Sequence, residues 1–301
     1  LAAVLATLCG LGADIRGVRR WIHLGPLLVQ PSELLKLGVV AAAARWFGDA
    51  TIGARSLTRA AAGVLGLVTL PALLLCAQPD LGSSTLLVVT GAATLTFTPR
   101  AGRSLALLAA SIVAPLLLAP WRLLHHYQRA RIEAFLMPEA HPGVAWQPRQ
   151  AELCLNAGGA FGSRAWLDAH HLPDAHTDYA LAAWGSLHGY VGTALVLGLF
   201  ALVAWRCFDV ARRADDRFDH ALCAGVGAMV SAQGLVNAAM VLRALPVVGV
   251  ALPLVSYGGS NLVVTLVGLG LVLGVDARLR AAPASPTKPG PERLYRGDPA
   301  A

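Results

Sequence analysis

Long apolar runs separated by clusters of charged residues constrain the fold of this chain more than any other feature. A transmembrane helix needs roughly 20 predominantly apolar residues, and seven runs approach or exceed that length, at 32–47, 60–77, 83–98, 104–120, 179–205, 221–242 and 261–276. Backbone polar groups in lipid must be satisfied within the segment, and these runs lack the alternating pattern of barrel strands. The sequence therefore predicts an all-α fold, a polytopic transmembrane helical bundle.

The composition excludes several other classes of protein. Only 14 % of the residues are charged, against roughly 25 % in a soluble domain. The net charge of +7 does not indicate nucleic-acid binding, because the basic residues lie between the apolar runs, where cytoplasmic loops carry them. The five cysteines lie far apart and form no CxxC pair, so neither a disulfide framework nor a structural metal site is expected.

The basic residues also predict how the bundle lies in a membrane. Counting the connections between runs places fourteen of the 24 bases on one side, namely Arg45, Arg55, Arg59, Arg100, Arg103, Arg206, Arg212, Arg213, Arg217, Arg278, Arg280, Lys288, Arg293 and Arg296. By the positive-inside rule, that side is expected to be cytoplasmic. The loop 121–178 then lies outside, and its length indicates a functional segment.

A single membrane domain is expected over residues 1–281, with the external loop 121–178 included in it. The Pro-rich segment 282–301 has too little apolar surface to pack and is expected to be a disordered cytoplasmic tail. The chain begins at Leu1 without Met, inside an apolar run too short to cross a bilayer, so the natural N-terminus is expected to lie upstream.

The carboxylate of Asp178 immediately precedes the run 179–205 on the external side. One hypothesis is a general base, which takes a proton from a hydroxyl as that hydroxyl attacks, with His176 close enough to assist. The structural alternative is that Thr177 caps the following helix and Asp178 complements the helix dipole, an effect of ~0.3–1 kcal/mol. Local sequence leaves both interpretations open.

Other charged residues occur within or beside the apolar runs. Glu33 and Lys36 are three residues apart, so on a helix they share one face. They form either an ion pair that neutralises two charges in lipid or part of a polar pathway for a ligand. Asp80, in the segment 78–82 (QPDLG), presents the same two possibilities.

Basic residues beside aromatic residues occur twice on the external side. Arg19 and Arg20 precede Trp21, and Arg129 and Arg131 follow a tyrosine. Guanidinium groups can hold a phosphate through two parallel hydrogen bonds, and surface solvation is the alternative explanation for each arginine.

Two segments rich in turn-forming residues also stand out. The segment 157–162 (AGGAFG) could approach a ligand closely, although it matches no phosphate-binding loop. The segment 252–260 (LPLVSYGGS), which contains Ser256 and Tyr257, interrupts two spans. Irregular backbone at membrane depth must line a cavity or be buried in protein.

A group of histidines and an aspartate in the external loop could bind a divalent ion. Its spacing matches no known metal motif, so no protein-ligated metal is predicted. The group consists of His170, His171, Asp174 and His176.

Taken in order, these motifs resemble the SEDS family (shape, elongation, division and sporulation), the RodA/FtsW-type peptidoglycan glycosyltransferases. The resemblance extends from Gly17 to about Val275. It is carried by the segments 17–22, 30–37, 78–82, 127–136, 158–162, 175–178 and 245–260, together with Gln233 and Asn237.

The resemblance implies a ten-span fold with both termini cytoplasmic, of which about eight spans are present. It implies polymerisation of lipid II at the outer face of the bacterial cytoplasmic membrane, with Asp178 as the catalytic carboxylate. A class B penicillin-binding protein is the implied transpeptidase partner, and a divalent cation (Mg or Mn) could assist the pyrophosphate. The candidate substrate-binding residues are Arg19, Arg20, Trp21, Glu33, Lys36, Asp80, Arg129, Arg131, His176, Ser256 and Tyr257.

The chain departs from the family pattern at a few positions. Ser186 and Leu187 stand where the family commonly has two glutamates, Ser163 and Arg164 stand where the glycine loop usually continues with Lys-Gly, and Ala251 replaces a common proline. Met240 and the segment 247–249 resemble the RodA elongation type more than the FtsW division type.

Two other functions stay open from the sequence. A flippase for lipid-linked precursors would use charges such as Glu33, Lys36 and Asp80 along a cavity open to both sides. A catalytically weakened scaffold that recruits the transpeptidase is suggested by Ser186 and Leu187.

Overall fold

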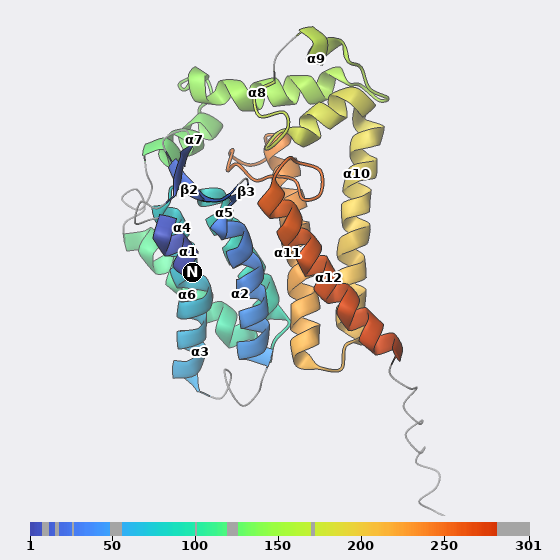
Figure 1. Ribbon diagram of the computed structural model, residues 1–301. Coiled ribbons are helices and arrows are strands. Elements are labelled where there is room, and N and C mark those ends of the chain that lie inside the picture. Colours follow the sequence, from blue (N-terminus) through green and yellow to red (C-terminus); the bar gives the residue numbers. More distant parts are fainter. Residues whose placement is uncertain are drawn as a thin grey trace, which may run out of the picture.

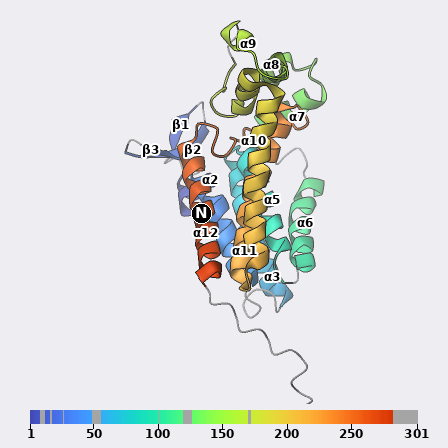
Figure 2. The same ribbon diagram turned by 90° about the vertical axis from the view of Figure 1, so that its right-hand side faces the viewer.

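A bundle of membrane-length helices carries a layer of short helices across one end in the computed structural model (Figures 1 and 2). The structure describes residues 1–7, 12–15, 18–25, 27–48, 56–99, 101–118, 126–169 and 172–281. The bundle is built from α2 (Pro31–Gly48), the continuous run of α3 (Leu57–Val64), η2 (Leu65–Thr69) and α4 (Leu70–Ala77), then α5 (Leu81–Thr96), α6 (Ala101–Leu118), α10 (Ala180–Arg213), α11 (Arg217–Val241) and α12 (Gly259–Ala281).

The seven expected spans are confirmed as helices. Among the described residues, four helices are long and apolar enough to cross a membrane by themselves, namely Leu57–Ala77, α10, α11 and α12. The remaining three are shorter or carry more charge, and packing places them in the bundle, where α5 lies against both α2 and α11. α10 continues to Arg213, eight residues beyond the expected end of its span.

α11 is the central helix of the bundle. It packs against α2, α5, α10 and α12, and most of its surface is buried. Small residues such as Ala224, Gly225 and Gly227 allow these close approaches, because a Cβ at Gly225 would overlap with side chains of α2 and α5. α11 therefore carries two polar residues, Gln233 and Asn237, into the interior with 1 % and 0 % exposure.

The first thirty residues correct the expectation of a purely helical fold. α1 covers only Ala2–Ala6, and β1 (Ala13–Ile15), β2 (Val18–Leu24) and β3 (Leu27–Val29) form an antiparallel sheet in the order β1-β2-β3. A turn at Gly25, with φ of +60°, joins β2 to β3. No strand was predicted over residues 13–29, because hydropathy alone does not identify short strands.

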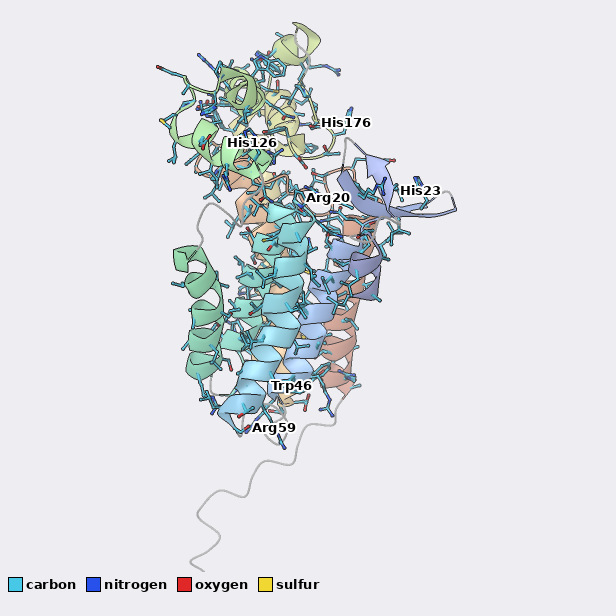
Figure 3. The ribbon with its side chains drawn as sticks, turned by 90° about the vertical axis from the view of Figure 1, so that its left-hand side faces the viewer. Arg20, His23, Trp46, Arg59, His126 and His176 are labelled. Carbon is cyan, nitrogen blue, oxygen red and sulfur yellow. The ribbon has the colours of Figure 1, made fainter. Side chains whose placement is uncertain are left out.

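Most of the loop 121–178 is helical and lies over one end of the bundle. It contains α7 (His126–Leu136), α8 (Pro142–Ala157) and α9 (Ala165–Ala169), and α8 runs across the end of the bundle in Figure 1. The sheet and the residues between α11 and α12 lie at the same end. Figure 3 shows Arg20 and His176 at this end and Trp46 and Arg59 at the opposite one.

The opposite end carries an ion-pair network. Asp276 on α12 accepts Arg206 and Arg213 from α10 and Arg280 from its own helix, at 3.5, 2.8 and 2.6 Å. Three of the bases that the sequence assigns to one side therefore meet in one cluster. The bases at 55, 100, 288, 293 and 296, and the predicted tail 282–301, lie outside the described residues.

α10 is kinked at Gly189, whose φ of +69° and ψ of −170° are not helical. The glycine-rich segment 158–163 fits into the kink, since the N–H groups of Tyr190 and Val191 donate to the carbonyls of Gly159 and Ala160 at 2.9 and 3.2 Å. A Cβ at Gly189 would overlap with the Ala160 carbonyl. The glycine segment thus joins the layer of α7, α8 and α9 to α10.

We expect Gly189→Ala to destabilise the protein, because alanine is strained at positive φ and its Cβ would meet the Ala160 carbonyl. The cost should be about 1–3 kcal/mol. Thermal unfolding of the protein in detergent measures it. The matched control is Gly198→Ala on the same helix, where an added Cβ meets nothing within 4 Å, and alanine there should be neutral or stabilising. Equal unfolding temperatures for the two variants would contradict a structural role for the kink.

Candidate functional site

Asp178 lies at the covered end of the bundle, half-buried and just before α10. The preceding turn is closed by the Asp174 carbonyl, which accepts the N–H groups of Thr177 and Tyr179 at 3.0 and 3.1 Å. Tyr179 is the N-cap of α10 and makes no side-chain capping bond. The Thr177 hydroxyl donates to Asp174 at 3.4 Å, so the alternative in which Thr177 caps this helix is wrong.

Two polar side chains attach the Asp178 segment to the loop between α11 and α12. The Asn237 amide donates to the carbonyls of Asp178 and Val250 at 2.8 and 2.7 Å. The Ser256 hydroxyl donates to the Thr177 carbonyl at 2.6 Å and accepts the N–H of Leu252 at 2.9 Å. These bonds hold the backbone that carries the carboxylate, so Asn237 and Ser256 are positioning residues.

Arg131 reaches the same region from α7. Its Nη1 donates to the Val247 carbonyl at 2.9 Å. A Cβ placed on Gly249, whose φ is +70°, would lie 3.3 Å from Asp178 Oδ2 and 3.7 Å from Arg131 Nη1. The carboxylate and the guanidinium therefore converge on Gly249, and any side chain there would occupy the space between them.

Asp80 forms a second polar cluster at this end, together with the sheet. It caps α5, since its Oδ1 accepts the N–H of Ser83 at 3.1 Å, and it lies 3.8 Å from Arg20 of β2. Arg20 also donates to the carbonyls of Gln78 (3.1 Å) and Pro79. Asp80 is therefore paired with Arg20, which agrees with the ion-pair alternative. The contacts of Arg20 also join β2 to the start of α5.

Glu33 and Lys36 form the predicted pair inside the bundle. Lys36 Nζ lies 2.9 and 2.8 Å from the two Glu33 oxygens, and the two residues are 8 % and 1 % exposed. The Asn261 amide on α12 donates to Glu33 at 3.1 Å. The pairing alternative is confirmed, and the pair joins α2 to α12.

The 245–258 loop connects the Asp80 cluster to the Asp178 site. A Cβ at Gly82 would overlap with the Val248 carbonyl and contact Val250 at 3.2 Å, so the first turn of α5 packs directly on this loop. Gly82 and Val248 are 166 positions apart in the sequence, yet they are in contact on neighbouring elements of the site.

The other candidate residues surround these clusters. Arg19 is exposed and Trp21 half-buried on β2, and Arg129 is half-buried on α7. His176 has an exposed side chain, and that of Tyr257 is 83 % exposed. The backbone joins the last two, since the Tyr257 N–H donates to the His176 carbonyl at 2.7 Å.

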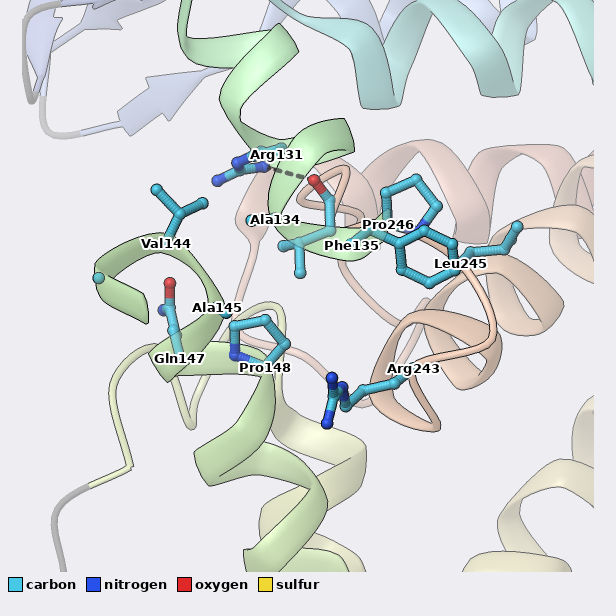
Figure 4. A pocket seen from close by; sticks show the side chains of 12 residues that line it. Arg131, Ala134, Phe135, Val144, Ala145, Gln147, Pro148, Arg243, Leu245 and Pro246 are labelled. Atoms are coloured by element: carbon cyan, nitrogen blue, oxygen red, sulfur yellow. Dashed lines mark hydrogen bonds between the residues drawn. The ribbon is translucent and has the colours of Figure 1, made fainter. Parts of the chain in front are cut away.

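A pocket of about 260 Å³ opens beside Arg131 (Figure 4). α7, the first turns of α8 and the segment 243–247 form its walls, and Arg243 and Gln147 contribute polar side chains. Arg243 was not predicted as a site residue, because no local pattern in the sequence marks it. Asn237 was also not among the predicted site residues, although it belongs to the family resemblance.

The donor groups around Asp178 do not fit a resident divalent ion. In the described part of the chain, no three His, Cys, Asp or Glu side chains are grouped closely enough to hold a metal. His170 and His171 of the candidate group lie outside the described residues. Burial raises the pKa of the nearby Cys154 thiol to about 11, which keeps it protonated at neutral pH and unsuited as a ligand or nucleophile.

The fold and site together define a polytopic membrane protein whose polar residues gather at one end of a helical bundle. The chain belongs to the FtsW/RodA/SpoVE family, described as cell cycle proteins, whose model matches residues 1–281.

Similar proteins include members of both main branches of the family. The chain is 32 % identical to a probable peptidoglycan glycosyltransferase FtsW from Trichlorobacter lovleyi, with 93 % of this chain and 74 % of that protein covered. It is 34 % identical to the peptidoglycan glycosyltransferase MrdB of Escherichia coli, covering 90 % and 74 %. A solved structure titled as a peptidoglycan synthase complex that coordinates polymerization and crosslinking matches with a TM-score of 0.73 and 32 % identity, covering 92 % and 80 %.

We expect Lys36→Met to lower stability strongly, because it leaves the Glu33 carboxylate buried without its cation. Breaking a buried pair costs about 3–5 kcal/mol. The double variant Glu33→Gln/Lys36→Met removes both charges and should be milder than either single change. Thermal unfolding of the four proteins in detergent forms the cycle. Single effects that are small and additive would disprove the coupling.

Proposed function

We propose that this chain polymerises lipid II into glycan strands at the outer face of the bacterial cytoplasmic membrane, as a peptidoglycan glycosyltransferase. The observation that carries the proposal is the convergence of the Asp178 carboxylate and the Arg131 guanidinium on Gly249. Relatives at 32–34 % identity that carry this activity in their names support it.

In the proposed reaction, the C4 hydroxyl of the acceptor's GlcNAc attacks C1 of the donor's MurNAc. Asp178 takes the hydroxyl proton as the new C4–O–C1 bond forms. The bond from C1 to the diphosphate breaks, and its electron pair leaves with undecaprenyl pyrophosphate. Arg131 stabilises the negative charge that develops on this leaving group. A divalent cation carried in with the pyrophosphate is compatible with this scheme, and no step is assigned to it.

The remaining candidate residues take supporting roles in this proposal. Ser256 and Asn237 fix the backbone of the catalytic segment. Arg20 and Asp80 hold the sheet beside the site. Polar or aromatic groups at the rim of the site would contact the substrate, namely those of Arg19, Trp21, Arg129, His176 and Tyr257.

The flippase alternative receives little support from the geometry. A flippase needs ionisable groups along a cavity open to both sides. Glu33, Lys36 and Asp80 are buried in ion pairs, and none of them lines either the pocket at Arg131 or the apolar groove between α10 and α11. The scaffold alternative rested on Ser186 and Leu187 in place of two glutamates. Ser186 is buried and donates to the Ser163 carbonyl at 3.1 Å. The Ser186 hydroxyl therefore joins α10 to the glycine segment through this hydrogen bond.

The proposed partner is a class B penicillin-binding protein, which would cross-link the strands that this chain makes. The structural relative titled as a complex for polymerization and crosslinking supports such a partnership. The matches to both FtsW and MrdB leave the division and elongation roles equally compatible with the chain, and the RodA-type assignment stays a prediction.

The orientation can be tested by cysteine labelling in intact cells, with the native cysteines replaced by serine. Phe161→Cys, at a position that is 84 % exposed in the external layer, should react with a membrane-impermeant maleimide. Asp215→Cys, in the exposed turn between α10 and α11, should react only after permeabilisation. The reverse pattern would place Asp178 in the cytoplasm and exclude the proposed reaction.

We expect Asp178→Asn to reduce lipid II polymerisation by about 10²–10⁴-fold, because the amide cannot accept the hydroxyl proton. Asparagine keeps the size of the side chain, so folding should be retained. The measurement is glycan-strand formation from lipid II by purified protein with its partner. Asp215→Asn makes the same chemical change at the far end of the bundle and should be fully active. Near-normal polymerisation by Asp178→Asn would eliminate Asp178 as the base.

A further inference from the structure

Arg243 adopts a backbone conformation that an arginine rarely takes. It follows the C-cap of α11 with φ of +54°. Its N–H donates to the Met240 carbonyl at 3.1 Å, and the N–H of Ala244 donates to Ala239 at 2.7 Å. This is the Schellman pattern, in which glycine is the usual residue at the left-handed position. Strained positions of this kind persist where the side chain has a task.

The side chain of Arg243 leaves α11 and reaches the external layer. Its Nη1 lies 2.8 Å from Glu152 Oε2 on α8, and it forms one wall of the pocket beside Arg131. A guanidinium has five N–H donors, so the bond to Glu152 leaves donors for a ligand. The two guanidinium groups in the pocket wall belong to Arg131 and Arg243, which are labelled in Figure 4. These two residues are far apart in the sequence.

The pocket has the character of a site for an anionic peptide. None of the described residues that line it is acidic, and Phe135, Val144 and Leu245 supply apolar surface. Gln147 contributes an amide group to the lining. Pro148 lies inside α8 and has no N–H to donate to the Val144 carbonyl.

This combination distinguishes peptide from phosphate. The apolar wall and the Gln147 amide favour a ligand with aliphatic parts and peptide groups, which a diphosphate lacks. The volume of about 260 Å³ is below the roughly 300–1,000 Å³ of sites that enclose a whole small molecule. The pocket therefore fits one end group rather than a disaccharide.

The pocket is also joined to the Asp178 site at two points. Arg131 belongs to both, since it lines the pocket and approaches Gly249 beside the carboxylate. Gln147 donates to Asp174 Oδ2 at 2.8 Å, and the Asp174 carbonyl closes the turn before Asp178. A group bound in the pocket would contact the residues that position the catalytic segment.

We propose that the pocket between α7, α8 and the segment 243–247 binds a carboxylate of the peptide attached to the lipid-linked substrate, with Arg243 as its cation. This rests on the proposed function for the identity of the substrate. It adds a specificity site, because it makes the enzyme prefer precursors whose peptide carboxylates are free.

The test compares binding of two probes to the full chain in nanodiscs, lipid II with free peptide carboxylates and the same lipid with those carboxylates amidated. Wild type should bind the free acid more tightly. Arg243→Gly should bind the free acid about tenfold more weakly, the effect of one lost charge-assisted hydrogen bond, and the amidated lipid as well as wild type does. Glycine suits the left-handed position, so the unfolding temperature of this variant should not fall.

Two further variants separate ligand binding from structure. Arg243→Lys should retain part of the preference for the free acid, since it keeps the charge. Glu152→Gln breaks the ion pair with Arg243 and leaves the pocket wall intact, so it should keep the full preference. A loss in Glu152→Gln equal to that in Arg243→Gly would assign Arg243 a purely structural role and overturn the proposal.

The other outcomes are also decisive. Equal weakening of both probes by Arg243→Gly would identify the diphosphate as the bound anion, and unchanged binding would leave the pocket without a role; either result overturns the proposal. Polymerisation is measured separately on the same samples. Carboxylate-dependent binding without polymerisation would reject the proposed function and support the carboxylate site in the pocket. Polymerisation without a preference for the free acid would support the proposed function and reject the carboxylate site.

Discussion

Hydrocarbon offers no hydrogen-bond partner, so each polar group at membrane depth must find one within the protein. The Lys36 ammonium is 1 % exposed and meets Glu33, which in turn accepts the Asn261 amide. α2 and α12 are thereby fixed against each other by charge as well as by packing. A charge pair inside a membrane bundle is expensive to break, which gives this contact a defining role in the arrangement of the helices.

The same constraint produces the functional site. Between α11 and α12 the chain leaves the helical hydrogen-bond pattern, and side chains bind several of its backbone groups. The Asn237 amide donates to the carbonyls of Val250 and Asp178. The Ser256 hydroxyl donates to the Thr177 carbonyl and accepts the Leu252 N–H. The same hydrogen bonds therefore hold both the loop and the catalytic segment in place. Gly249 completes the site by leaving space between Asp178 and Arg131.

One departure from the family pattern, at Ser186, has a local structural explanation. Ser186 and the glycine segment fit each other at the kink of α10, where Ser163 N–H donates to the Ser186 carbonyl at 2.7 Å. Ala251 in place of proline has no consequence that the contacts of the structure explain.

The sequence by itself determined the seven spans and the Glu33–Lys36 pair, because hydropathy and helical spacing are local properties of the chain. It also indicated Asp178 and Arg131 through family motifs. Only the tertiary structure decided that these two side chains converge on Gly249, that Asn261 completes the buried pair, and that residues 13–29 form a small sheet. Contacts between residues on separate elements depend on how those elements pack, and no local pattern encodes that packing.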